Sequence, residues 1–220
     1  MYHLNWRPVI QHFDLLWHGL LFGLGLALLS LAVGCIIGIF GAFGRVYGGK
    51  PVRTAITAYT EFVRNIPLLL IIYCVYYGLG IMKITILDNV WSFIFALSFY
   101  SGAYLTEVFR AGILAVPVGL IEAGKAIGLT PRQTMQNVTI PLTFRIVLPS
   151  LSNTFIGLFK DTSLASAISV PELTYGAMRI NVETWRILEV YATVAVLYLI
   201  ACYALAGVLR MLERRFVMVK

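Results

Sequence analysis

Long apolar runs without charged residues constrain the fold of this chain more than any other feature of its sequence. The first run, residues 15–43, contains no Asp, Glu, Lys or Arg. It is longer than the ~20 residues that a helix needs to cross a hydrocarbon core of ~30 Å, so we expect it to tilt or protrude. Such blocks differ from the short alternating runs of a half-buried strand. They indicate an all-α integral membrane protein whose solvent is mostly lipid.

The composition supports the same class. Of the 220 residues, 60% are hydrophobic and only 12% are charged, and a soluble domain of this length could not cover so much apolar surface. We therefore predict a single transmembrane domain, residues 1–220, with five membrane-spanning helices. The predicted segments are residues 15–43, 56–81, 90–114, 141–159 and 187–209, the fourth being followed by an apolar but broken extension.

The placement of Lys and Arg predicts the orientation in the membrane. Residues 44–55 hold three of them, residues 110–145 hold four, and the end of the chain after residue 209 holds another four. The opposite side has four in all, and Arg64 and Lys160 lie within or beside membrane segments. Because Lys and Arg are enriched in cytoplasmic loops, the richer side is expected to be cytoplasmic. The N-terminus then faces out and the C-terminus faces in.

A polar stretch, EAGKAIGLTPRQTMQNVTIP at residues 122–141, lies between the third and fourth apolar segments. Its first residues tolerate a helix, and we expect Glu122 in the first turn, where the helix dipole favours an acid. Gly128 can adopt the left-handed conformation that ends a helix. The stretch therefore begins as a short helix that a glycine turn terminates.

A second short helix is predicted directly after this turn. Thr130 precedes Pro131, and Gln133 lies three residues after the threonine. This is the order of a capping box with proline at the first helical position. Residues 117–140 are thus expected to form a cytoplasmic hairpin of two short helices.

Three small residues, Ala123, Gly124 and Gly128, leave part of this hairpin nearly free of side chains. A surface helix that needed only solubility would carry Lys and Glu at such positions. Bare backbone suits close docking into a groove of another protein, and it equally suits packing against the subunit's own membrane helices. Spacing alone leaves both interpretations open.

The stretch PVGLIEAGKAIGLTPRQTMQNVTIP, followed by Arg145, resembles the cytoplasmic "EAA" signature of ABC-importer permease subunits. Within that group the chain is most similar to the polar amino acid uptake permeases of the histidine/glutamine/arginine/glutamate type. Gly124 replaces the usual second alanine, and Leu142 and Thr143 replace a frequent Gln-Ala pair. Three further stretches carry the resemblance, namely EFVRNIPLLL, AYLTEVFRAGI and NTFIGLFKDTSLASAISVPEL.

The resemblance implies a type I ABC-importer permease core in a bacterial cytoplasmic (inner) membrane. The hairpin would be the coupling helix, held in a cleft of a separate ATPase subunit that binds ATP and Mg, while this chain holds no cofactor. The other implied partners are a second permease copy or a homologous permease, a periplasmic or tethered amino acid binding protein, and membrane lipid, but no nucleic acid. The residues expected to make the ATPase joint are Glu122, Ala123, Gly124, Ala126 and Gly128.

The chain itself is not expected to be an enzyme. It has no GxxxxGK[ST] phosphate loop, and no paired carboxylates or Ser/His arrangement at a plausible spacing. Its three histidines, His3, His12 and His18, do not have the spacing of a metal site, so no metal is predicted. The alternative function is a secondary amino acid transporter or channel that works without an ATPase, but this alternative gives the hairpin no role.

Placing a charged residue inside an apolar membrane segment costs free energy, so such residues usually face a cavity or a partner. Glu61 and Arg64 are three residues apart, so an ion pair between them is the simpler account of Glu61. Arg64 and Asn65, followed by the helix-breaking Pro67, are candidates to line the substrate path, because a bend exposes backbone groups that can hold a zwitterion. Glu107 and the arginine three residues later are expected to form a structural ion pair.

Asn153, Lys160 and Asp161 are further candidates for the substrate path, in the fourth segment and its extension. Asp161 could instead cap the apolar run that follows it, which would make the Lys160-Asp161 pair a local structural device. Capping and pore lining are left open as equal alternatives. None of these residues identifies the amino acid that is carried.

Overall fold

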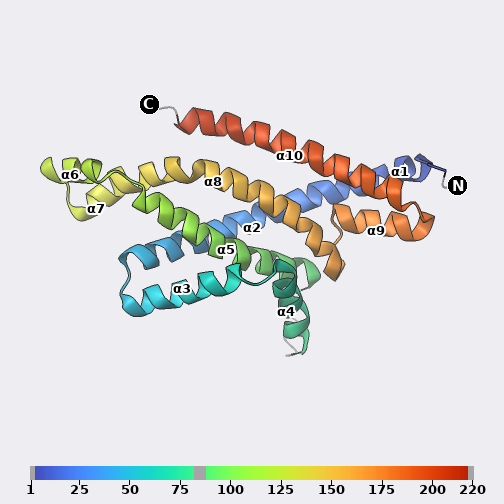
Figure 1. Cartoon of the computed structure of the whole chain (residues 1–220), viewed down its shortest axis with the longest axis horizontal. Helices are drawn as coiled ribbons and strands as arrows, with labels where there is room; N and C mark the ends of the chain where they lie inside the picture. The colour runs from blue at the N-terminus through green and yellow to red at the C-terminus, as the bar shows by residue number, and fades with distance from the viewer. Residues whose placement is uncertain (1–2, 82–87, 218–220) are drawn as a thin grey trace.

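The computed structural model describes residues 3–81 and 88–217, and no strand occurs within these two ranges. Four long helices lie lengthwise in Figure 1, with the short helix α1 at one end and the α6–α7 hairpin at the other. The elements are α1 (Arg7–Gln11), α2 (Phe13–Tyr47), α3 (Lys50–Arg64), α4 (Leu68–Ile81), α5 (Asn89–Leu114), α6 (Val118–Ala126), α7 (Pro131–Thr134), a π-turn (Met135–Thr139), α8 (Ile140–Asp161), a 3₁₀ segment (Thr162–Ile168), α9 (Leu173–Thr184) and α10 (Ile187–Val217).

Three helical stretches of the described chain are long and apolar enough to cross a membrane by themselves. They are α2, the stretch Pro131–Ile168 that contains α8, and Ile187–Arg215 within α10. Two bent helix pairs, α3 with α4 and α5 with α6, would raise the number of spans to at most five. The exposed face of α10 is strongly apolar, as Leu199 and Tyr203 illustrate. The chain is therefore a multi-pass membrane protein.

The predicted second segment, residues 56–81, is not one helix. Helix α3 ends at Arg64, α4 begins at Leu68, and the two helices are bent by 103°. Pro67 explains the break, because its ring disfavours helical backbone at the preceding residue and it has no N–H to donate. Helix α4 consequently projects away from the long helices (Figure 1).

Glycines of α2 let other parts of the same subunit approach closely. A Cβ atom at Gly19 would lie 2.8 Å from the backbone of Glu172 and Leu173, and one at Gly38 would lie 2.6 Å from the Cβ of Leu105. Gly34 faces α5 in the same way as Gly38. These glycines therefore serve close helix packing within the subunit.

The fourth predicted segment has the expected broken extension. Helix α8 passes into the 3₁₀ segment, which ends at Ser169 with a left-handed backbone (φ 60°), and α9 then starts after Glu172. The main hydrophobic core lies around this turn and includes Phe93, Phe159 and Leu173. The extension is thereby fixed against α2 and α5.

Candidate functional site

The hairpin has the predicted glycine turn and capping box, but its second helix is not a separate short one, because α7 continues through the π-turn into α8 within one helical stretch, Pro131–Ile168. Helix α5 bends by 58° into α6, and Gly128 ends α6 with a left-handed φ of 86°. The Thr130 hydroxyl accepts the backbone N–H of Gln133 at 3.3 Å, and the Gln133 side chain accepts the backbone N–H of Thr130 at 2.9 Å. Both bonds of the capping box are therefore present.

The expected place of Glu122 is wrong. Helix α6 starts at Val118, after Pro117 in an extended conformation, so Glu122 follows the first turn instead of lying in it. The first turn contains only apolar residues and glycine, and Glu122 gains little from the helix dipole because that effect fades within one turn.

The small residues of the hairpin have two different environments. Gly124 is buried inside the hairpin, where an added Cβ would lie 3.4 Å from Leu129 and 3.6 Å from Thr134, and its carbonyl accepts the N–H of Leu129 at 3.0 Å. Its packing thus serves the hairpin's own turn, which neither of the two sequence interpretations had anticipated. The remaining members of the predicted joint are exposed, namely Glu122, Ala123, Ala126 and Gly128.

Large apolar side chains lie exposed beside these small residues. Val118 is 66% exposed and Ile127 is 79% exposed, although a polar hairpin outside the bilayer would normally carry charges there. We refer to the exposed residues Val118, Glu122, Ala123, Ala126, Ile127 and Gly128 as the hairpin face. This face combines small and large apolar side chains with one carboxylate, that of Glu122.

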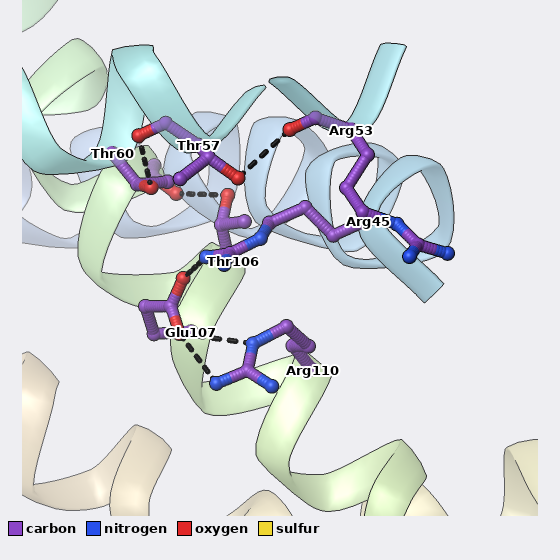
Figure 2. A network of polar contacts seen from close by, with 8 residues as sticks. Arg45, Arg53, Thr57, Thr60, Thr106, Glu107 and Arg110 are labelled. Carbon is purple, nitrogen blue, oxygen red and sulfur yellow. Dashed lines mark hydrogen bonds and ion pairs between the residues drawn. The ribbon is translucent and has the colours of Figure 1, made fainter. Parts of the chain in front are cut away.

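A network of ion pairs holds the root of the hairpin (Figure 2). Arg110 donates to the Glu107 carboxylate through Nε at 3.0 Å and Nη2 at 2.9 Å, which confirms the predicted pair. Arg45, at the end of α2, binds the other oxygen of Glu107. The sequence analysis missed Arg45, because only folding brings it to a carboxylate 62 residues away. The network ties α2 to α5 about two helical turns before α5 ends at Leu114.

A cavity of about 160 Å³ lies between α5 and α8, and it contains one of the predicted path residues. Asp161 lines it together with the hydroxyl-bearing side chains of Tyr100 and Tyr104, whose oxygens are 3.2 Å apart. The guanidinium of Arg64 lies over the Tyr104 ring, 5.3 Å from its centroid. The Asp161 carboxylate thus lines the cavity, and the Arg64 guanidinium, which is not one of its lining residues, is connected to it through the Tyr104 ring. The remaining lining residues are Ser101, Thr154, Gly157 and Leu158.

Arg64 does not pair with Glu61 as expected. No ion pair joins these two residues in the described ranges, and Arg64 turns instead to the Tyr104 ring, where a cation–π contact holds it. Asn65 ends α3 and donates its side-chain amide to the Glu61 carbonyl at 2.7 Å. Pro67 forms the bend, and neither Asn65 nor Pro67 lines the cavity.

Lys160 and Asn153 are separated from the Asp161 cavity. Lys160 lines an open groove of about 450 Å³ between α8 and α10, and Asn153 is exposed on α8 outside both spaces. Asp161 precedes the 3₁₀ segment, but its side chain makes no capping hydrogen bond. Of the two alternatives for Asp161, capping is therefore wrong, and the carboxylate faces a cavity.

Two buried carboxylates were not singled out from the sequence. Glu172 is 1% exposed; it accepts the N–H groups of Thr174 and Tyr175 at 2.8 Å and the Tyr198 hydroxyl at 3.1 Å. Glu189 is fully buried and accepts the backbone N–H of Asn5. The position of Glu172 directly before a helix is the signal that would have revealed its cap. In the described ranges no group of three or more His, Cys, Asp or Glu residues could hold a metal ion.

Comparisons with known proteins agree with this architecture. The family of binding-protein-dependent transport system inner membrane components matches residues 34–218. The chain is 39% identical to the L-cystine transport system permease protein of Bacillus subtilis (strain 168), covering 96% of this chain and 91% of that protein. It is 34% identical to the glutamine transport system permease protein of Escherichia coli (strain K12), covering 96% and 97%.

Solved structures show the same fold. The crystal structure of an amino acid ABC transporter with histidines has a chain that matches with a TM-score of 0.91 and 30% identity, over 97% of this chain and all of that one. The inward-facing MetNI methionine ABC transporter matches with a TM-score of 0.76 at 21% identity, over 93% and 97%, and this likeness shows the fold alone. The family match, the relatives and the fold confirm the resemblance seen in the sequence: the chain belongs to the binding-protein-dependent transport system inner membrane components, the permease subunits of ABC transporters.

Proposed function

We propose that this chain is the permease subunit of an ABC importer that moves polar amino acids across the bacterial cytoplasmic membrane. The family match over residues 34–218 carries the proposal, and the amino acid permeases to which the chain is similar over nearly its whole length support the substrate class. ATP hydrolysis belongs to a partner subunit, which binds ATP and Mg. A secondary transporter without an ATPase is not favoured, because the matched family works with binding proteins and ATPases.

The hairpin face is the proposed joint to the ATPase. Ala123, Ala126 and Gly128 allow close approach of backbone, while Ile127 supplies an apolar contact that a cleft would bury. Gly124 contributes indirectly, because its lack of a side chain lets Leu129 pack against α6 inside the hairpin. This role requires that the hairpin lie in the cytoplasm. The topology that we propose with it has five spans, an N-terminus outside the cell membrane and a C-terminus in the cytoplasm.

The cavity between α5 and α8 is the proposed substrate site. The Arg64 guanidinium can bind a carboxylate through two parallel N–H donors, and the Asp161 carboxylate can accept an α-ammonium group. The hydroxyls of Tyr100, Tyr104 and Thr154 then surround a polar side chain. Charged groups this deep in a membrane protein usually serve a substrate or ion path, which supports this assignment.

Transport would need further partners outside this chain. A second copy of the permease, or a homologous one, would complete the pore, and a periplasmic or tethered binding protein would deliver the amino acid. The family description as a binding-protein-dependent system supports the binding protein, and the second permease is what the resemblance to ABC-importer permeases implies. Lipid covers the exposed apolar faces of the assembled helices.

Reconstitution in proteoliposomes tests the proposal. The permease, its ATPase and its binding protein should give amino acid uptake that requires internal ATP. Uptake by the permease alone, driven by an ion gradient, would overturn it. For the substrate site, Arg64→Gln and Asp161→Asn should abolish uptake while assembly with the ATPase survives. Asn153→Ala is the matched control on α8, and an equal loss of uptake in that variant would refute the choice of cavity.

A further inference from the structure

Exposed tryptophans lie at the end of the bundle opposite the hairpin. The sequence has four tryptophans, at positions 6, 17, 91 and 185. Trp185, between α9 and α10, is 84% exposed, and Trp6, directly before α1, is 45% exposed. Figure 1 shows α1, α9 and the start of α10 at one end of the bundle, and α6 and α7 at the other. Neither Trp6 nor Trp185 belongs to the hairpin face or to the proposed substrate site.

Trp185 has an unfavourable backbone conformation. Its φ is 56°, in the left-handed region that glycine occupies readily and a bulky residue rarely adopts. Its backbone N–H donates to the Asn181 carbonyl at 2.8 Å, which closes the turn after α9. Such strain persists only where the surrounding structure fixes it, and it often accompanies a function. A large aromatic side chain that projects from this turn therefore indicates a contact outside the subunit.

Two hydrogen bonds fix the start of the chain to the same turn. Arg186 donates through Nη1 to the His3 carbonyl at 2.7 Å. Glu189, which is fully buried, accepts the backbone N–H of Asn5 at 2.8 Å. The residues on either side of Asn5 are apolar and exposed, as are the residues that follow Arg186. We call these exposed residues the tryptophan rim, namely Leu4, Trp6, Trp185, Ile187 and Leu188.

The length of α10 relates this rim to the membrane. Residues 190–209 of the helix contain no Asp, Glu, Lys or Arg, and Arg210 follows them directly. A helical stretch of this length spans about 30 Å, which is the thickness of the hydrocarbon core. With Arg210 at one edge of that core, Trp185 lies about 7 Å beyond the other edge. The headgroup layer there is about 5–8 Å thick, so the rim falls within it.

We propose that the tryptophan rim binds the lipid headgroup layer and that Trp185 is its anchor. The exposed apolar surface continues from Ile187 and Leu188 to Val196 and Ile200 along α10, which favours lipid over a water-soluble protein as the partner. The indole ring of Trp185 contacts the upper acyl chains, and its N–H donates to a lipid oxygen, the arrangement for which Trp is enriched at membrane interfaces. This proposal depends on membrane embedding and not on transport or orientation.

Fluorescence quenching by labelled lipids in phosphatidylcholine vesicles tests the depth of Trp185 in the full-length chain. Trp185 is kept as the only tryptophan by Trp6→Phe, Trp17→Phe and Trp91→Phe, all at exposed or partly exposed positions. A nitroxide on the headgroup should quench Trp185 about twofold more strongly than a nitroxide near the end of the acyl chains. The matched control adds Trp185→Phe and Ile200→Trp, because Ile200 is 60% exposed near the middle of the charge-free stretch. In this control the acyl-chain label should quench about twofold more strongly.

A chain that keeps only Trp6 should show the same preference for the headgroup label as Trp185, because the bonds to His3 and Asn5 hold both side chains at one end of the bundle. Equal or stronger quenching of Trp185 by the acyl-chain label would overturn the proposal, as would opposite preferences of Trp6 and Trp185. Quenching of Trp185 by iodide in the water, with no effect of either lipid label, would also overturn it. That last result is expected of a surface that docks a binding protein instead of lipid.

Discussion

The contact between α2 and α5 should depend on the absence of a side chain at Gly38. A Cβ atom there would lie 2.6 Å from the Leu105 Cβ, 2.9 Å from the Leu105 backbone carbon and 3.1 Å from the backbone nitrogen of Thr106. Two of these three atoms are backbone, so no rotation of a side chain can relieve the contact. Helix α5 would have to move away from α2 along part of their interface.

The size of the effect follows from two opposing contributions. Replacing glycine with alanine inside a helix favours folding by about 1 kcal/mol, and this gain is the same wherever the glycine lies in the helix interior. Overpacking of a tight contact costs about 1–3 kcal/mol. Gly25 is the matched control, because it belongs to the same helix and an added Cβ there meets no atom within 4 Å. Gly38→Ala should therefore be less stable than Gly25→Ala by about 1–3 kcal/mol.

Equilibrium unfolding in mixed detergent micelles, followed by tryptophan fluorescence, measures this difference. Gly25→Ala should unfold at the same or a higher fraction of denaturing detergent than the unchanged chain, and Gly38→Ala at a lower one. If the two variants shifted equally, helix propensity would explain both of them. The close approach of α2 to α5 would then be unimportant for stability.

Three further changes test the hairpin and its root. Glu107→Gln leaves Arg45 and Arg110 facing each other without a carboxylate and, for half-buried pairs, should cost about 1–2 kcal/mol in the same unfolding assay; an unchanged midpoint would contradict the network. Gly128→Val places a β-branched residue at φ 86° and should abolish uptake at normal membrane levels, whereas normal uptake would count against the joint. Thr130→Ala removes the cap and should destabilise α7 by about 1 kcal/mol. Hydrogen exchange of the α7 backbone amides should then be faster than in the unchanged chain. Unchanged exchange rates would contradict this role of Thr130.

Local sequence signals predicted the elements whose causes are local. The capping box at Thr130 and the left-handed Gly128 depend on neighbouring residues alone, and both are present. Hydropathy alone predicted the apolar segments that contain α2, α8 and α10, which are long enough to cross a membrane by themselves, while the second and third segments belong to bent helix pairs. Glu122 was misplaced because the helix begins four residues earlier, at Val118, where no strong N-cap residue marks its start.

Features that depend on other helices could not be predicted in the same way. Pro67 signalled a break, but the 103° angle depends on the packing of α4 against α5. The Arg64–Glu61 spacing suggested an ion pair, yet an aromatic ring on α5 competes for the guanidinium. Lys160 and Asp161 are adjacent in sequence and face different spaces, since consecutive helical residues point about 100° apart.

Helix α5 connects the two proposed sites mechanically. Tyr104 borders the cavity, Glu107 binds α2 one turn later, and α6 begins at Val118. At the rise of an α-helix, Tyr104 and Val118 are about 21 Å apart along the helix path. If the hairpin moves when the ATPase closes, the Glu107 network determines how rigidly α2 follows α5. Glu107→Gln should then lower the amount of amino acid taken up per ATP hydrolysed, while ATPase activity persists. An unchanged ratio would mean that α2 is not needed for coupling, and that α5 alone transmits the movement to the cavity.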